Sequence, residues 1–145
     1  MCTIKLNAGF RVLIVNLNQQ AIPLLPTGSL IQTDSKFGHE LIAGPVVGDR
    51  QVVAHKEPGV GAHVETIDSA RQRYQFTKVI VPVNDVHGAR TWSRMLQQRG
   101  EAWDPLDNCQ HAARQAYCGV PDSPAVRGVV VCAGLLLLHL VTNRE

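Results

Sequence analysis

The stretch "HELIAGPVVGDRQVVAHK" (39–56) reads as two strands joined by a tight turn. Branched aliphatic residues dominate both arms, as in a buried sheet, and "GDR" at 48–50 supplies the turn. Gly44 and Pro45 interrupt the first arm, and such residues suit an edge strand or a bulge better than a central strand. Antiparallel pairing across the turn would bring His39, which begins one strand, close to His55, which nearly ends the other. The stretch therefore predicts an antiparallel sheet with two imidazoles on neighbouring strands.

Further elements surround this hairpin. The strand-like runs are 10–17 ("FRVLIVNL"), 29–34 ("SLIQTD") and 78–83 ("KVIVPV"), and "EPGVGAH" (57–63) reads as a loop. Helical spacing follows, with one helix over 88–100 and a second over 109–119 that begins after a cap at Asp107 or Asn108 and ends at Gly119. Strands followed by helices predict an α+β fold, an antiparallel sheet with helices packed on one face.

Length and composition indicate one globular domain over 1–127, with its core in 23–119, followed by an apolar segment over 128–145. The chain has 145 residues, 45% of them hydrophobic, and a formal charge of +2, which is too small to require nucleic acid or an acidic membrane as partner. No secretory signal precedes the cysteines, so reduced thiols in a cytosolic setting are expected. The four cysteines are Cys2, Cys109, Cys118 and Cys132.

The run 128–141, "GVVVCAGLLLLHLV", is apolar apart from His139. As a helix it would extend about 21 Å, which is short of the roughly 30 Å hydrocarbon core of a bilayer. Two interpretations stay open. The run either closes the core as a buried element or forms a membrane-associating tail.

Cys109 is the first residue of the second predicted helix. Unpaired N–H groups and the helix dipole favour an anion there, which would lower the thiol pKa and suit a nucleophile. The base must come from elsewhere in the fold. His39 could take the thiol proton while His55 orients it through a ring N–H.

Other roles for Cys109 are possible. A free cysteine is commonly a buried packing residue. A zinc site with His111 is the third option, but C-x-H is not an ordinary ligand spacing and no second ligand pair completes it. His111 lies two positions further along the helix and so points away from Cys109, which favours a capping or core-polar role.

The remaining chemistry-bearing residues predict no further site, no metal and no cofactor. Three histidines show no partner in the sequence and are expected at the surface or in satisfied positions, and two cysteines are expected to be packing residues. These are His63, His87 and His139, and Cys118 and Cys132. The run "RQRYQFTK" (71–78) mixes basic and aromatic residues, as an RNA-contacting strand or a solvated face would.

The combination of "TGSLIQTD…GHELIAGPVVGDRQVVAHKEP" (27–58) with "NCQHAA" (108–113) resembles the lecithin-retinol-acyltransferase-like group of the papain-like NlpC superfamily. That group includes the cellular phospholipase A/acyltransferases, also called HRAS-like suppressors, and the resemblance covers roughly 23–119. Its H-box strand lacks the usual aromatic residue and carries Gly44-Pro45, and Ala112 replaces the phenylalanine of the NC box. In this divergent form the chain is similar to the H-box/NC type of picornavirus 2A protein.

The resemblance implies a permuted papain-like (NlpC-type) fold with the nucleophile at a helix N-terminus. It implies Cys109 as nucleophile, His39 as general base, His55 as orienting residue, Asn108 as a structural asparagine and His111 as the histidine of the NC box. In the cellular enzymes the cysteine attacks an acyl ester of a phospholipid, and the thioester passes to an amine, a lysolipid or water.

For the viral proteins, the resemblance implies a non-structural protein that supports genome replication and is not a protease. Its expected place is the host-cell cytoplasm at membranes, with membrane contact through 128–141. Host or viral replication proteins and viral RNA are the expected partners. Two alternatives remain open: an active thiol phospholipase A/acyltransferase of the cellular type, and an RNA- or host-protein-binding module without catalysis.

Overall fold

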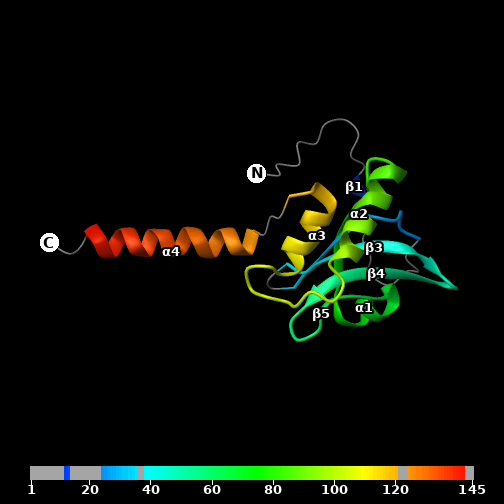
Figure 1. The fold of residues 1–145 in the computed structure, drawn as a ribbon, viewed down its shortest axis with the longest axis horizontal. Coiled ribbons are helices and arrows are strands. Elements are labelled where there is room, and N and C mark those ends of the chain that lie inside the picture. Colours follow the sequence, from blue (N-terminus) through cyan, green and yellow to red (C-terminus); the bar gives the residue numbers. More distant parts are fainter. Residues whose placement is uncertain (1–11, 14–23, 36–37, 121–123, 143–145) are drawn as a thin grey trace.

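The computed structural model describes residues 12–13, 24–35, 38–120 and 124–142. Over these residues the chain forms an antiparallel six-stranded sheet in the order β1-β6-β2-β3-β4-β5 (Figure 1). The strands are β1 (Val12–Leu13), β2 (Leu30–Thr33), β3 (Glu40–Val47), β4 (Arg50–Glu57), β5 (Gly61–Thr66) and β6 (Phe76–Ile80). The helices are α1 (Ile67–Arg73), α2 (Asp85–Gln97), α3 (Cys109–Cys118) and α4 (Pro124–Thr142). The predicted α+β class is confirmed.

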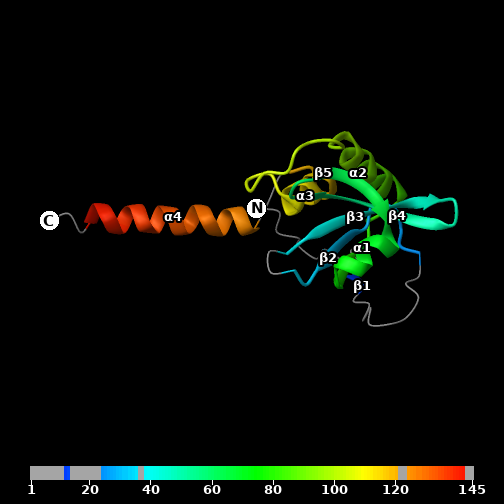
Figure 2. The same ribbon diagram turned by 90° about the horizontal axis from the view of Figure 1, so that it is seen from below.

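Helices cover both faces of the sheet, not one face as the sequence predicted (Figures 1 and 2). One buried cluster joins the sheet to α2 and α3, and a second joins its other face to α1. The cause is visible in β3, where the consecutive residues Leu41 and Ile42 are both fully buried. Side chains alternate between the faces of a strand, so an uninterrupted apolar run requires cover on both sides.

The hairpin of 39–56 forms as predicted, but its first arm lies inside the sheet. β3 pairs with both β2 and β4, and its register with β4 shifts between Ala43 and Val46. The edge position is therefore wrong, while the bulge is present. Gly44 is also needed for packing, because a Cβ at this position would lie 2.5 Å from the Trp92 ring of α2.

Several boundaries differ from the sequence prediction. Of the strand predicted over 10–17, residues 12–13 are described, as β1, and the rest lies outside the described residues. The loop predicted over 57–63 is a short turn followed by β5, so β4 and β5 form a second hairpin. Helix α1 was not predicted because its seven residues are too few to show a helical period. Helix α3 agrees closely, with Asn108 as its N-cap and Gly119 at φ 76° as its C-cap.

Helix α4 extends away from the sheet in both views (Figures 1 and 2). Its described side chains are exposed, Leu135 and Leu136 by 62% and 59%, so this segment does not close the core. Cys132 is exposed as well, and its predicted packing role is wrong. Among the described helices, none combines the length and the hydropathy that crossing a bilayer requires. Membrane association of the tail stays a prediction.

A buried ion pair joins α3 to β3. Arg114 donates through Nε and Nη2 to the Glu40 carboxylate, at 3.0 and 2.7 Å for its shortest contacts, and Glu40 is 2% exposed. One turn earlier on α3, the Gln110 side-chain amide donates to the Gly38 carbonyl oxygen at 2.6 Å. Gly38 has φ 69°, and a Cβ there would clash with that amide. Both contacts hold the start of α3 against the start of β3.

We expect Arg114→Met to destabilise the fold by about 3 kcal/mol, because it leaves the buried Glu40 carboxylate without its counter-charge. Urea unfolding measures this loss. Adding Glu40→Gln to Arg114→Met should recover a substantial part of it, since the neutral amide costs less to bury. Arg99→Met, at an exposed position, is the control. Equal stability of Arg114→Met and Arg99→Met would contradict a structural role for the ion pair.

Candidate functional site

Cys109 opens α3 and lines a pocket. The Asn108 side-chain oxygen accepts the backbone N–H groups of Gln110 and His111, at 3.1 and 3.2 Å, and so fixes the first helical turn. The pocket has a volume of about 420 Å³, within the range of small-molecule sites. Its lining combines the thiol and one imidazole with apolar residues, namely Ser35, His39, Pro58, Trp103, Pro105, Asn108 and Cys109.

His39 is held in place by its backbone and by a ring contact. Its N–H donates to the Ser35 hydroxyl at 2.6 Å, and its carbonyl oxygen accepts both the N–H and the hydroxyl of Thr33 at 3.0 Å. Its ring stacks on Tyr74, with 4.3 Å between ring centroids and 15° between planes. The imidazole is therefore fixed at the pocket wall, where Cys109 also lies.

The two predicted histidines form a hydrogen-bonded relay that ends on a carboxylate. His39 Nε2 lies 2.8 Å from His55 Nδ1, and His55 Nε2 lies 2.7 Å from Glu65 Oε1. An ionised carboxylate only accepts, so His55 Nε2 carries a proton. The lone pair of a neutral His55 is then on Nδ1, and His39 Nε2 must donate to it. This assignment leaves Nδ1 as the basic nitrogen of His39.

The thiol and both imidazoles are neutral at pH 7. Burial, reinforced by His55, lowers the pKa of His39 from 6.5 to about 4, and burial likewise lowers the pKa of His55. Burial also raises the pKa of the Cys109 thiol above its ordinary value of 9.0, although the N–H groups of Glu40 and Gln110 oppose this. The thiol pKa lowering that the sequence predicted is therefore wrong, since desolvation outweighs the helix N-terminus.

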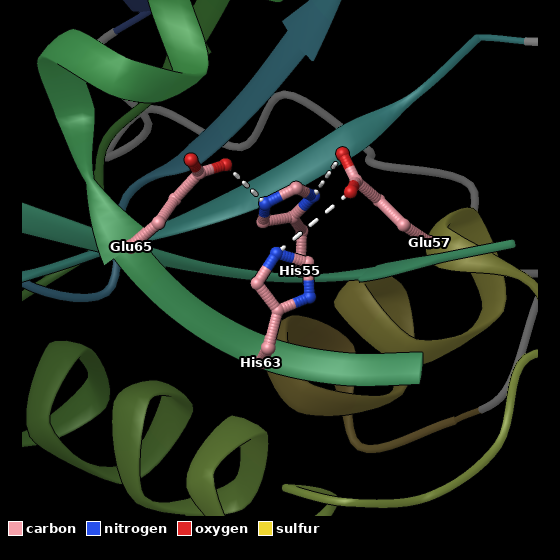
Figure 3. Close-up of side chains that lie close together, drawn as sticks. All are labelled: His55, Glu57, His63 and Glu65. Carbon is pink, nitrogen blue, oxygen red and sulfur yellow. Dashed lines mark hydrogen bonds and ion pairs between the residues drawn. The ribbon is translucent and has the colours of Figure 1, made fainter. Parts of the chain in front are cut away.

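A second set of charged groups lies behind His55 (Figure 3). Glu57 accepts a hydrogen bond from the Tyr74 hydroxyl, and Arg73 contacts both Glu57 and Glu65. Burial by itself raises the pKa of both the Glu57 and the Glu65 carboxyl group. Even so, the hydrogen bond from Tyr74 to Glu57 and the charge of Arg73 hold the pKa of Glu57 low, and a hydrogen bond from a serine hydroxyl does the same for Glu65. These carboxylates stay ionised and anchor the relay.

Sequence reasoning missed this second set, although a signal was present. The chain carries the pattern His-x-Glu twice, as "HKE" (55–57) and "HVE" (63–65), and residues two apart share a face of a strand. His63 was predicted to have no partner. Instead it lies 3.8 Å from Glu57 and belongs to a group of four side chains, with His55 and Glu65, whose arrangement could hold a metal ion.

The other predicted residues have varied positions. His111 is half-buried, and its Nδ1 has no hydrogen-bond partner within the part of the chain that the structure describes. His87 is satisfied, with Nε2 2.9 Å from the Tyr117 carbonyl oxygen. Cys118 packs beside the α2–α3 cluster, no disulfide joins the cysteines among the described residues, and Cys2 lies outside them. The run 71–78 is not one strand, because α1 ends at Arg73 and β6 begins at Phe76.

Lys56 ties the pocket's outer loop to the sheet. Its side chain is fully buried, and Nζ lies 2.5 Å from Asp107 and 3.5 Å from Glu101. The loop between α2 and α3 also pairs with β5, where Ala62 N–H donates to the Glu101 carbonyl oxygen at 2.9 Å. This loop carries Trp103 and Pro105 of the pocket lining. The pocket wall is therefore attached to the strand that bears His55.

Comparison of the chain with protein-family models, with curated proteins and with solved structures finds no match in any of the three.

The site places the Cys109 thiol and the neutral His39 imidazole on the lining of one pocket, and the His55–Glu65 relay lies behind that imidazole. A thiol can add to a carbonyl carbon if a neutral imidazole that faces the same pocket takes the proton during attack. A pocket wall of tryptophan and proline suits an apolar substituent on that carbonyl. The arrangement is thus capable of acyl transfer.

Alkylation of Cys109 by iodoacetamide should be slow at neutral pH, and its rate should still be rising with pH at pH 9. The reason is that the thiolate is the reacting species and burial raises the pKa of this thiol. Mass spectrometry of the Cys109 peptide measures the rate at each pH. The exposed Cys132 in the same sample controls for reagent activity. A rate that is already maximal below pH 7 would mean a thiolate–imidazolium pair and would contradict the neutral pair.

Lys56→Met should loosen the loop without unfolding the domain. Methionine preserves the buried stem, and the released Asp107 and Glu101 side chains are 45% and 52% exposed, so both can be hydrated. We expect faster cleavage after Glu101 by a glutamate-specific protease, with a near-unchanged midpoint of thermal unfolding. Lys78→Met, on β6, is the control. Unchanged cleavage in Lys56→Met would show that the pairing with β5 alone holds the loop.

Proposed function

We propose that this chain is a thiol acyl hydrolase or acyltransferase that acts on lipid-like esters through an acyl-cysteine intermediate. One observation carries the proposal. Cys109 and His39 line the same largely apolar pocket, and His39 is hydrogen-bonded through His55 to a half-buried carboxylate, Glu65. This is the geometric pattern of nucleophile, base and orienting groups that acyl transfer requires.

The first half-reaction forms a thioester. The Cys109 S–H proton passes to His39 Nδ1 as sulfur bonds to the ester carbonyl carbon. The backbone N–H of Cys109, at the N-terminus of α3, stabilises the oxyanion. The ester C–O bond then breaks, and the leaving oxygen takes the proton from His39. The His55–Glu65 hydrogen bond stabilises His39 during the step in which it is protonated, because the carboxylate attracts the positive charge through the relay.

The second half-reaction regenerates the thiol. Water, an alcohol or an amine attacks the thioester carbonyl and gives its proton to His39. The C–S bond breaks, and the sulfur of Cys109 recovers a proton from His39. The acceptor decides whether the outcome is hydrolysis or transfer.

The pocket and the tail favour a lipid-like acyl donor. Pro58, Trp103 and Pro105 offer an apolar wall for an acyl chain beside the thiol. Helix α4 is apolar and exposed, and an amphiphilic surface would cover it. We infer that α4 contacts a membrane and brings phospholipid esters to the pocket.

The fold is proposed to be papain-like in permuted order. In papain-like enzymes the cysteine precedes the histidine in the chain. Here the histidine strands β3 and β4 precede the cysteine helix α3, while the helix still packs against the sheet that bears the histidines. A circular permutation, in which the two ends of the chain are joined and a new break is made elsewhere, converts one order of elements into the other.

The resemblance to the H-box/NC type of picornavirus 2A protein supports a wider proposal. In that role the chain would support viral genome replication at membranes of the host cytoplasm, with host or viral replication proteins as partners. A binding module without catalysis is the competing candidate, and the neutral, desolvated thiol favours it. Two of the basic and aromatic residues in the run 71–78 that the sequence offered for RNA, Arg73 and Tyr74, are engaged with the site, which favours a protein or lipid partner over RNA.

Incubation with p-nitrophenyl esters of short-chain and medium-chain fatty acids should acylate Cys109. We expect an acyl adduct on the Cys109 peptide by mass spectrometry, formed faster from the medium-chain ester because of the apolar pocket. Cys109→Ala should abolish it, and His39→Ala should slow it by about 10²- to 10⁴-fold. Cys118→Ala is the matched control and should acylate normally. An adduct elsewhere in the chain that persists in Cys109→Ala, or none at all in the unaltered chain, would overturn the proposal.

A further inference from the structure

Two histidines and two glutamates converge on one face of the β4–β5 hairpin (Figure 3). His55 and Glu57 lie two residues apart on β4, and His63 and Glu65 lie two residues apart on β5. His55 and His63 are directly paired across the strands. One nitrogen or oxygen from each of the four side chains lies within 4.8 Å of the other three.

Each carboxylate has one oxygen that accepts a hydroxyl from outside the group, and in Glu57 this oxygen also lies 3.6 Å from His55 Nδ1. Tyr74 donates its hydroxyl to Glu57 Oε1, and Ser69 donates its hydroxyl to Glu65 Oε2 at 2.5 Å. The inner atoms are Glu57 Oε2 and Glu65 Oε1. Outer partners of this kind orient the carboxylates of metal sites.

Each imidazole likewise has one ring nitrogen held by an outside partner and one available to the group. His63 Nδ1 donates to the Gly61 carbonyl oxygen at 3.0 Å, so the lone pair of a neutral His63 is on Nε2, which lies 3.8 Å from Glu57 Oε2. Two acceptors therefore face each other there. His55 is held through Nδ1 by His39, with its Nε2 in the group. Metal-bound histidines are fixed in this way by a partner on the second ring nitrogen.

Arg73 supplies the positive charge that this group needs. Its Nη1 lies 3.0 Å from Glu57 Oε2, and its Nη2 contacts Glu65 Oε1, which are the two inner oxygens. One guanidinium thus balances two carboxylates. The Arg73 side chain is 43% exposed and can leave towards solvent.

We propose that His55, Glu57, His63 and Glu65 form a binding site for one divalent transition-metal ion, such as Zn²⁺, which displaces Arg73. Two imidazoles and two carboxylates suit zinc better than magnesium or calcium. Zinc–ligand bonds of about 2.0–2.2 Å place ligands about 3–4 Å apart, so the group must close by about 1 Å. A divalent ion would balance the two carboxylates fully.

Metal binding would also switch the relay, an effect that rests on the proposed function. Zinc on His55 Nε2 removes the proton that Glu65 holds there, so the neutral ring must carry its proton on Nδ1. That N–H then donates to His39 Nε2, and the neutral His39 carries its own proton on Nδ1. The nitrogen that would accept the Cys109 proton is thereby occupied. The bound ion acts as an inhibitor of acyl transfer.

Zinc affinity measured against a chromophoric chelator tests the site without reference to activity. With Cys109→Ala as the background, so that no active-site thiol contributes, we expect one Zn²⁺ per chain. Adding His63→Ala should weaken binding at least tenfold, whereas His139→Ala, an exposed histidine of α4, should not change it. Arg73→Met should strengthen binding, because the competing cation is gone. If Arg73 only held the four side chains in place, Arg73→Met would weaken zinc binding instead.

No zinc binding in either the Cys109→Ala or the Cys109→Ala/Arg73→Met chain would overturn the proposal, as would equal affinity of the His63→Ala and His139→Ala chains. The inhibitory step is measured separately, with the thiol present. Zinc should slow Cys109 acylation in the unaltered chain but not in His63→Ala, each compared with its own zinc-free rate. Acylation that is unaffected by bound zinc would overturn the proposed inhibition but not the proposed metal site. A chain that binds zinc without acylating would overturn the proposed function instead.

Discussion

The ion pair between Arg114 on α3 and Glu40 on β3 determines where the reactive groups meet. Glu40 directly follows His39, and Arg114 lies on the helix that Cys109 begins, so this contact fixes the distance between two parts of the chain that are remote in sequence. The Gln110 contact to Gly38 adds a second point of attachment. With two points fixed, α3 can neither slide nor rotate on the sheet. Cys109 and His39 are consequently positioned by buried polar contacts between α3 and the sheet, and not only by the loop that precedes α3.

Burial of these groups sets the kind of catalysis that is available. A buried thiol and a buried imidazole both resist charge, and the structure lowers one pKa and raises the other until the neutral pair dominates. Such a cysteine is a poor nucleophile until a substrate is present and His39 can take its proton in the same step. The same neutrality protects the thiol from oxidants, which react with the thiolate. Low reactivity at rest is thus compatible with acyl transfer, and it is also what a scaffold without catalysis would show.

Local patterns in the sequence were sufficient for the first hairpin, for α3 with its Asn108 cap, and for the pairing of His39 with His55. They failed where long-range contacts decide. Gly44 looked like a strand breaker, yet its missing side chain makes room for Trp92 on a distant helix. The direction of the Cys109 pKa shift depends on how deeply α3 is buried, which no local pattern reveals. Glu65 and Tyr74 became part of the site only because β5 and α1 fold back beside β4, and the short α1 was not visible as a helix.

His55 is the residue on which the two halves of the site depend. Its Nδ1 lies 2.8 Å from His39, with Glu57 further away at 3.6 Å, and its Nε2 lies 2.7 Å from Glu65 on β5. A neutral imidazole has one proton, so the group that lies against one nitrogen decides what the other can do. A carboxylate at His55 Nε2 keeps the His55 proton there. The lone pair on His55 Nδ1 then accepts the proton of His39 Nε2, which leaves His39 Nδ1 free to act as a base. A metal cation at Nε2 reverses the order, so that His39 carries its proton on Nδ1 and can no longer accept one there. The chemistry of the pocket is therefore set behind it, by groups that no substrate touches.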